Sequence, residues 1–204
     1  MKRLFDIICS IIALMLLSPA LIITALIIRI TIGTPVFFIQ ERVGLDEKII
    51  RLFKFRSMTN ETDEEGNLLP NHVRVTKFGR FIRKTSLDEL PSLLNVLKGE
   101  LSLVGPRPLL VSYLPYYKLE HKVRHSVKPG ITGLAQVNGR NATTWQKRLD
   151  FDAYYVENGS FLLDMKIIFL TVYKVIKSDG VEGQSDLSII PLSKDENYLG
   201  NEHD

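Results

Sequence analysis

The adjacent carboxylates Asp88 and Glu89 are the strongest candidates for reactive groups in this sequence. They lie in SLDELP (residues 86–91) and follow a short run that holds three cations, Arg80, Arg83 and Lys84. Neighbouring acids repel each other unless cations share the site. An ionised carboxylate in such surroundings can attack a phosphorus atom, and its neighbour can hold a divalent ion. On this functional interpretation the segment carries phosphate chemistry, with Asp88 and Glu89 as catalytic residues and Glu89 as a metal ligand.

The same segment also has a purely structural interpretation. Ser-x-x-Glu is the pattern of a helix capping box, in which Glu89 bonds the backbone of Ser86 and Asp88 favours the helix dipole. Pro91 complicates this interpretation, because it has no amide hydrogen and so places the start of the helix later than the box implies. On this pattern alone, the cap is favoured over a catalytic pair.

A rigidly held arginine is the second candidate feature. Arg107 stands between Pro106 and Pro108, which fix the backbone and hold the arginine extended. A guanidinium held in this way suits bidentate binding of phosphate. The structural alternative is a stiff turn with a surface arginine.

Other basic residues extend this lining. Arg140 follows the turn at Asn138-Gly139, and Lys54 and Arg56 share one face of an expected strand. Each has an ordinary alternative, which is a hairpin turn for Arg140 and a solvated strand face for the other two. The sequence thus offers several phosphate ligands without choosing among them.

The N-terminal segment is apolar enough to enter a membrane. Between Asp6 and Arg29 lie 22 residues without a charge, which as a helix would measure about 33 Å. The pair Ser18-Pro19 interrupts it in the middle, where we expect a kink. Both flanks are basic, so the positive-inside tendency is best met by a broken helix that enters and leaves through one leaflet. An ordinary kinked transmembrane anchor is the alternative.

Beyond this segment the pattern predicts an α/β fold, mostly helical with a short β-hairpin. Alternating residues predict strands at 36–40 and 49–56, and leucines at helical spacing predict a helix that ends at Lys98. Two further helices are expected at 144–156 and 161–177, the second buried or lying at a membrane interface.

The net charge of +3 conceals an uneven distribution. Residues 179–204 hold seven acids against one lysine, so residues 1–178 carry +9. A basic body joined to an apolar segment suits an anionic membrane surface and phosphate-bearing ligands. We expect three parts: a re-entrant membrane hairpin (1–33), a catalytic domain (34–178) with interfacial amphipathic helices, and an acidic, loosely ordered tail (179–204).

Several other chemistries find little support. The four histidines show no zinc-ligand spacing and are interpreted as surface residues: His72, His121, His125 and His203. The single cysteine, Cys9, excludes an internal disulfide. No nucleic-acid motif accompanies the basic residues, so nucleic acid is not an expected partner. There is no P-loop and no dinucleotide-binding glycine pattern.

Taken together, the motifs resemble those of the bacterial sugar transferase family, the small monotopic polyprenyl-phosphate phosphoglycosyl transferases. The matching segments are Ser18-Pro19, KFRSM (54–58), SLDELP (86–91), LLNVLKGELSLVGPRPLL (93–110), RHSVKPGITGLAQVNGRN (124–141) and FDAYYVENGSFLLD (151–164). Their order and joint occurrence are highly specific, and they cover the chain to about residue 177. The resemblance favours catalysis over the capping box. It also favours the re-entrant hairpin, because that family is embedded in one leaflet, and this chain resembles its minimal form.

The resemblance implies a two-step transfer. Asp88 would attack the β-phosphate of a UDP-sugar and release UMP, and a polyprenyl phosphate would then attack the phosphosugar–Asp88 intermediate. Glu89 would hold Mg²⁺ against the diphosphate. Phosphate or nucleotide contacts would come from the cations Lys54, Arg83, Arg140 and, within Pro106–Pro108, Arg107. The enzyme would act at the cytosolic face of the bacterial inner membrane, in the first membrane step of surface glycan assembly, with downstream glycosyl transferases as candidate partners.

Two other functions compete with this interpretation. One is a catalytically silent, membrane-anchored module that binds nucleotide-sugars or scaffolds other enzymes; the retention of Asp88 and Glu89 beside the basic elements argues against it. The other is a glycosyl transferase that releases UDP. It would need an Asp-x-Asp metal motif at a strand end, and the only such spacing, at Asp150 and Asp152, falls in an expected helix. The sequence does not identify the sugar.

Overall fold

The computed structural model describes residues 1–139, 143–177 and 191–199. Its strands are β1 (Phe37–Val43), β2 (Ile49–Phe55), β3 (Ser102–Val104) and β4 (Gly130–Thr132). Its α-helices are α1 (Lys2–Thr31), α2 (Asn71–Arg74), α3 (Lys77–Lys84), α4 (Leu93–Lys98), α5 (Leu134–Val137), α6 (Trp145–Asn158), α7 (Phe161–Lys177) and α8 (Glu196–Leu199). Its 3₁₀ helices are η1 (Leu45–Glu47), η2 (Leu87–Ser92), η3 (Val111–Tyr116), η4 (Leu119–Ser126) and η6 (Leu192–Lys194).

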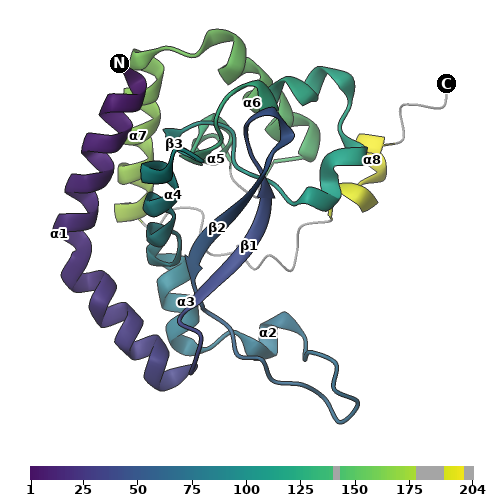
Figure 1. The fold of residues 1–204 in the computed structure, drawn as a ribbon. Helices are drawn as coiled ribbons and strands as arrows, with labels where there is room; N and C mark the ends of the chain where they lie inside the picture. Colours follow the sequence, from purple (N-terminus) through teal and green to yellow (C-terminus); the bar gives the residue numbers. More distant parts are fainter. Residues whose placement is uncertain (140–142, 178–190, 200–204) are drawn as a thin grey trace.

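A long antiparallel hairpin of β1 and β2 runs through the middle of the molecule (Figure 1). This confirms the predicted hairpin, although β1 is longer than the predicted strand at 36–40. In β2, Ile50 and Leu52 are buried against Val96 and Leu101. Side chains alternate along a strand, so Lys54 continues the row of Ile50 and Leu52. The hairpin therefore carries one lysine from the edge of an apolar cluster into the region of η2.

A second, very small sheet was not predicted from the sequence. In it β3 and β4 pair in parallel, with Ser102 opposite Gly130 and Val104 opposite Thr132. Each strand has three residues, too few for a periodic pattern to mark it. Glycine is required at the crossing, because a Cβ atom on Gly130 would lie 2.1 Å from the amide nitrogen of Gly105. This close approach brings the segment after β3 beside the start of β4.

The apolar N-terminal segment forms one continuous 30-residue helix, α1, that is long and apolar enough to cross a membrane. Figure 1 shows it bowed along the side of the molecule. Pro19 lies inside the helix without ending it, and the hydroxyl of Ser18 donates to the Met15 carbonyl at 2.8 Å. The predicted interruption at Ser18-Pro19 is therefore not a break in the helix. Proline removes one backbone hydrogen bond, and the rest of the ladder continues around it.

The first turns of α1 are bound to the rest of the fold by polar contacts. The Lys2 ammonium donates to Asp164 Oδ2 at 2.5 Å and to the Val104 carbonyl at 3.1 Å. The Arg3 guanidinium donates to carbonyls of Val96 and Leu97 in α4. Asp6 Oδ2 accepts a hydrogen bond from the Ser102 hydroxyl at 2.8 Å.

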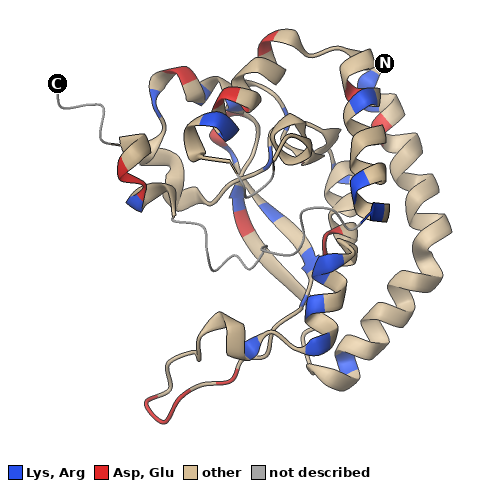
Figure 2. Ribbon diagram, turned by 180° about the vertical axis from the view of Figure 1, so that it is seen from behind, with Lys and Arg blue, Asp and Glu red and all other residues tan. Residues whose placement is uncertain are grey.

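The other end of α1 is bound by apolar packing instead. Ile28 is fully buried in a cluster with Phe55 of β2 and Ile82 of α3. The charged residues of α1 lie near its two ends, and the stretch between them is uncharged (Figure 2). Both ends of the helix thus rest on the same folded body, which α1 follows along its length.

The C-terminal half of the domain is helical, as predicted for α6 and α7. Two sequence interpretations need correction here. His121 and His125 are not surface residues, because 1% and 6% of their surfaces are exposed. The tail is folded where the structure describes it: Leu192 and Tyr198 are buried in a cluster with Trp145. Leu192 and Tyr198 are apolar or aromatic residues within an acidic stretch. The prediction of a loosely ordered tail rested on the net charge and did not consider them.

Candidate active site

The two acids lie in the 3₁₀ helix η2, not in the first turn of an α-helix. Ser86 precedes η2 with a left-handed backbone (φ 57°), and its side chain makes no capping hydrogen bond. The helix α4 begins only at Leu93, because Pro91 has no amide hydrogen to donate. The capping-box interpretation is therefore wrong, and the expectation of a late helix start is confirmed.

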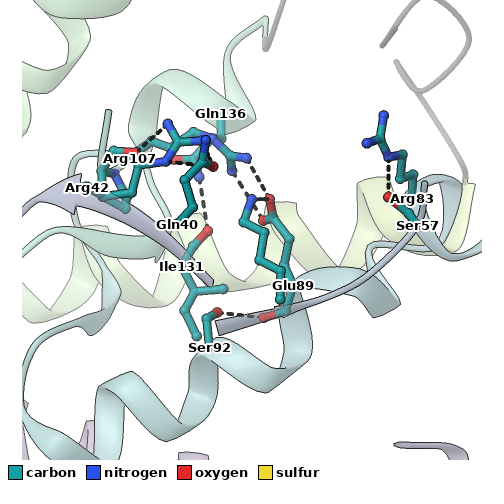
Figure 3. A network of polar contacts seen from close by, with 11 residues as sticks. Gln40, Arg42, Ser57, Arg83, Glu89, Ser92, Arg107, Ile131 and Gln136 are labelled. Atoms are coloured by element: carbon teal, nitrogen blue, oxygen red, sulfur yellow. Dashed lines mark hydrogen bonds and ion pairs between the residues drawn. The ribbon is translucent and has the colours of Figure 1, made fainter. Parts of the chain in front are cut away.

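The side chain of Glu89 is held by two cations from distant parts of the chain. Lys54 of β2 donates to Oε1 at 2.9 Å. Arg107 donates through two nitrogens, at 2.6 Å to Oε1 and 3.2 Å to Oε2, which is the bidentate geometry that guanidinium favours with carboxylates. Figure 3 shows Arg107 and Glu89 pointing toward each other from opposite sides of this network.

These cations determine the protonation of Glu89. Burial alone would raise the pKa of this carboxyl, but attraction to Arg107 and Lys54 outweighs it and holds the pKa well below its ordinary value. Glu89 is therefore a fixed negative charge at neutral pH. The carboxylate is anchored by these two cations, and it is unsuited to exchanging protons.

Asp88 is in a different electrostatic state from its neighbour. Burial and the charge of Glu89 raise its pKa to about 7, against the opposing influence of Lys54, Arg83 and Arg107. Among the described residues, none donates a hydrogen bond to the Asp88 carboxylate, whereas Glu89 accepts three. Asp88 is thus the uncommitted acid of the pair, surrounded by cations that attract an anionic substrate.

The Pro-Arg-Pro segment lies beside β1 and β4, which fix its course. The amide of Gly130 donates to the Pro106 carbonyl at 2.9 Å, and the amide of Val43 donates to the Leu109 carbonyl at 3.0 Å. The segment therefore runs between the hairpin and the start of β4. This course brings the Arg107 guanidinium over Glu89, a contact that the sequence did not predict.

A shallow pocket opens beside this network. Its lining combines charged and apolar side chains: Arg42, Leu52, Lys54, Glu89, Ser92, Leu101, Arg107, Pro108, Gly130 and Ile131. Arg42 was not among the predicted site residues; it donates to Gln40 Oε1 at 2.6 Å and to the Pro108 carbonyl at 3.4 Å. Arg42 and Gln40 are two residues apart on β1, so their side chains lie on the same face of the strand. This spacing was the signal in the sequence that could have identified Arg42. With three cations and one carboxylate, the pocket suits an anionic ligand.

Comparison with known proteins relates this chain to enzymes that act on sugars. A family profile described as "Bacterial sugar transferase" matches residues 1–178. The chain belongs to the bacterial sugar transferase family. An "Uncharacterized sugar transferase EpsL" of Bacillus subtilis is 57% identical over 182 residues, covering 89% of this chain and 90% of that protein.

Two relatives of this sugar transferase carry more specific names. A UDP-glucose:undecaprenyl-phosphate glucose-1-phosphate transferase of Klebsiella pneumoniae is 48% identical over 183 residues, covering 85% of this chain and 39% of that protein. An undecaprenyl-phosphate galactose phosphotransferase of Salmonella typhimurium is 41% identical over 198 residues, covering 88% and 41%. The chain thus spans about two fifths of each of these longer proteins, whose names specify different sugars.

The structure of the sugar transferase gathers only some of the predicted ligands. Lys54 and Arg107 meet at Glu89, so the alternative of a solvated strand face for Lys54 is wrong. Arg83 lies apart from them in Figure 3, where Nε donates to the Ser57 hydroxyl at 2.8 Å. Arg56 bonds the Met58 and Thr34 carbonyls and serves the backbone there. Arg140 lies outside the described residues.

The acids of the sugar transferase fit a divalent cation that shares its ligands with a substrate. Within the described residues, no group of three or more His, Cys, Asp or Glu side chains could form an all-protein cage. Magnesium, however, is usually held by one or two carboxylates together with substrate phosphates. A carboxylate has about four acceptor positions, and Glu89 uses three of them. One position on Glu89, together with Asp88, remains for a metal.

Proposed function

We propose that this sugar transferase moves a phosphosugar from a UDP-sugar to a polyprenyl phosphate, through a covalent intermediate on Asp88. The asymmetry of the two acids carries this proposal. Glu89 is held by Lys54 and Arg107, while Asp88 is uncommitted and lies among the same cations. An enzyme that attacks phosphorus needs one carboxylate free to react and cations to stabilise the developing charge.

The reaction proceeds in two displacements at one phosphorus atom. An Asp88 oxygen attacks the β-phosphorus, which bears the sugar, and the bond to the bridging oxygen breaks so that UMP leaves. An oxygen of the polyprenyl phosphate then attacks the same phosphorus and breaks its bond to Asp88. The carboxylate is regenerated, and the product is a polyprenyl diphosphate sugar. The ionised form of Asp88 is the attacking form, and burial with the charge of Glu89 raises the pKa of this carboxyl to about 7.

The remaining residues position charge around these steps. Arg107 and Lys54 neutralise the non-bridging oxygens of the diphosphate, and Pro106 and Pro108 keep the arginine in place. Arg83 adds positive charge on another side of Asp88, and Arg140 completes the proposed nucleotide contacts. Mg²⁺, held by Glu89 and the diphosphate, would withdraw negative charge from the leaving group. Positioning and cationic stabilisation supply most of the catalysis in reactions of this class.

The contacts of α1 support the re-entrant topology that we propose for residues 1–33. A helix that crosses the bilayer places its ends on opposite sides. Here Lys2 and Asp6 bind α7 and β3, while Ile28 packs on β2 and α3. One folded body holds both ends, which supports placing both ends on one side of the membrane. We propose the cytosolic side, because both flanks are basic.

The exposed apolar faces of two helices support embedding in a single leaflet. On α1, Leu16 is 75% and Ile30 is 82% exposed; on α7, Leu162 is 80% and Ile176 is 79% exposed. The two helices lie side by side in Figure 1, and the rings of Phe5 and Phe161 pack edge to face with their centroids 5.4 Å apart. Apolar surface of this extent needs a nonaqueous partner, and it lies on the side of the molecule that α1 covers.

Release of nucleotide from the detergent-solubilised enzyme tests the function. The assay supplies undecaprenyl phosphate, Mg²⁺ and a panel of UDP-sugars that includes glucose, galactose and N-acetylated sugars. We expect UMP with at least one member of the panel, which also identifies the sugar. UDP in place of UMP would mean transfer of the sugar alone, and no release with any sugar would favour a binding or scaffold module.

Substitution of Asp88 tests the covalent step. Asp88→Asn is expected to abolish UMP release and the radiolabelled phosphosugar adduct on the protein, because an amide cannot serve as the nucleophile. Its melting temperature should stay close to that of the unmodified enzyme. Glu65→Gln, an equivalent change in an exposed loop, should retain turnover. An Asp88→Asn enzyme that still turns over would refute the intermediate.

Cysteine labelling tests the topology of α1. Cys9 is first replaced by alanine, and single cysteines are placed in a short N-terminal tag or at Thr34. An impermeant thiol reagent added to sealed inner-membrane vesicles of known orientation should label both positions equally. Labelling on opposite sides would show that α1 spans the bilayer.

A further inference from the structure

The backbone of the Pro-Arg-Pro segment is held mainly through its carbonyl groups. Pro106 and Pro108 have no amide hydrogen, so neither can donate. The Pro106 carbonyl accepts from the Gly130 amide at 2.9 Å, and the Pro108 carbonyl accepts from Arg42 at 3.4 Å. The carbonyl between them belongs to Arg107, and it accepts the shortest bond of the three, from Arg124 at 2.6 Å.

Arg124 is a buried arginine whose other donors are also engaged. Nε and a terminal nitrogen donate to Asp152 Oδ2 at 3.1 and 2.9 Å, and the second terminal nitrogen donates to the Tyr117 hydroxyl at 3.2 Å. The side chains of Arg124 and Asp152 are 2% and 5% exposed. Arg124 lies in η4 and Asp152 in α6, so this pair ties two helical elements to the active-site loop.

Stability alone gives a poor reason for this arrangement. Burying two charges costs several kcal/mol per ion, and apolar residues of similar volume often stabilise a fold equally well. A buried guanidinium can do what an apolar residue cannot, which is to donate a directed hydrogen bond to one carbonyl. The carbonyl it reaches is that of the arginine that binds Glu89.

We propose that Arg124 is a positioning residue, which fixes the backbone of Arg107 so that the Arg107 guanidinium is held over Glu89 and the diphosphate. Asp152 supplies the counter-charge that keeps Arg124 in place, and the Tyr117 hydroxyl accepts from the terminal nitrogen that faces away from Asp152 and Arg107. The catalytic part of this inference rests on the proposed function, whereas the holding of the loop does not. Misplacement of a catalytic group by about 1 Å can cost on the order of 100-fold in rate, so loss of Arg124 should slow catalysis without any loss of substrate contact.

The first measurement reports the backbone protection of the Pro-Arg-Pro loop and does not require catalytic activity. The variant Arg124→Met with Asp152→Leu removes both charges together, which avoids an unpaired buried ion and preserves the fold. Hydrogen–deuterium exchange of the full-length protein in detergent should become at least 10-fold faster in the peptide that covers residues 104–112. Tyr117→Phe is the matched control, since it removes one partner of Arg124 and leaves the bond to the Arg107 carbonyl intact. Its exchange in this peptide should change by less than threefold.

The second measurement is a double-mutant cycle on kcat for UMP release. The Arg124→Met/Asp152→Leu variant should lose about 10- to 100-fold in kcat when Arg107 is present. In an Arg107→Ala background the same change should cost less than threefold, because there is no guanidinium left to position. A merely structural role would lower kcat equally in both backgrounds.

The outcomes separate this inference from the proposed function. Faster exchange together with the non-additive cycle supports Arg124 as a positioning residue. Unchanged exchange in the loop overturns the inference, and so does an additive cycle. If the unmodified enzyme releases no UMP, the proposed function fails, while the exchange result alone still decides whether Arg124 holds the loop.

Discussion

Two arginine–carboxylate pairs contact the same loop. They contain the same kinds of charged group but differ in exposure to solvent and in the pKa of the carboxyl. In the open pair, Arg107–Glu89, the side chains are 41% and 23% exposed. In the sealed pair, Arg124–Asp152, they are 2% and 5% exposed. Arg107 belongs to both regions, because its guanidinium serves the open pair and its carbonyl is bound by the sealed pair.

Electrostatics separates the two carboxylates as clearly as exposure does. Burial raises the pKa of Asp152, and Arg124 only partly opposes that rise. For Glu89 the attraction of Arg107 and Lys54 prevails and lowers the pKa. One cation does not offset the desolvation of Asp152, whereas two cations offset that of Glu89. The open pair can therefore exchange a partner for substrate phosphate at small cost, whereas the sealed pair cannot be opened without leaving a buried charge.

The largest expected effect comes from breaking the sealed pair. Asp152→Ala leaves Arg124 buried without a counter-charge, which should lower the free energy of unfolding by about 3–5 kcal/mol. Denaturant or thermal unfolding in detergent measures this loss. Replacing both partners together, as in Arg124→Met/Asp152→Leu, should recover most of it. A small loss from Asp152→Ala alone would mean that the pair is not sealed from water.

The open pair should respond in the opposite way. Glu89→Gln removes the charge that holds Lys54 and Arg107, so kcat for UMP release should fall about 100-fold. The free energy of unfolding should change by no more than about 1 kcal/mol, because the pair is partly solvated. Kinetics and unfolding measured on one preparation give both numbers. A variant that unfolds easily but keeps its activity would reverse the roles assigned to the two pairs.

The open pair was within reach of sequence reasoning. Asp88, Glu89, Lys54 and Arg107 were all candidates, because acids beside cations and a Pro-Arg-Pro segment carry local signals. The hairpin was also predicted, since its two strands alternate around an evident turn. The sequence pattern could not predict which cation pairs with which acid. It did not indicate that Lys54 and Arg107 bind Glu89, which is a contact between residues 35 and 18 positions apart.

The sealed region was largely missed, for a physical reason. Arg124, His121 and His125 look polar in sequence, and polar residues are usually exposed. Their burial depends on partners elsewhere in the chain, such as Asp152 and Tyr198. The small β3–β4 sheet was missed because three-residue strands carry no period.

The smallest effect that we predict comes from protonating the sealed region. His125 is buried beside Tyr117, near Arg124 and Lys122, and 3.6 Å from the half-exposed Glu47. Burial, with repulsion from Arg124 and Lys122, lowers its pKa to about 4, against an ordinary value of 6.5. Between these values the unfolded chain binds the proton and the folded chain does not, so the folded state loses stability as pH falls through this window.

This effect can be isolated by comparison with a variant. The loss approaches about 1.4 kcal/mol per pH unit below pH 6, which amounts to about 1.6 kcal/mol between pH 6.5 and pH 5. His125→Gln cannot take up this proton, so its unfolding free energy should fall less than that of the unmodified enzyme over the same range. The difference between the two proteins removes the contribution of every other titrating group. Identical pH profiles would show that His125 ionises freely, and that the cluster around Arg124 admits water and charge as readily as the active site does.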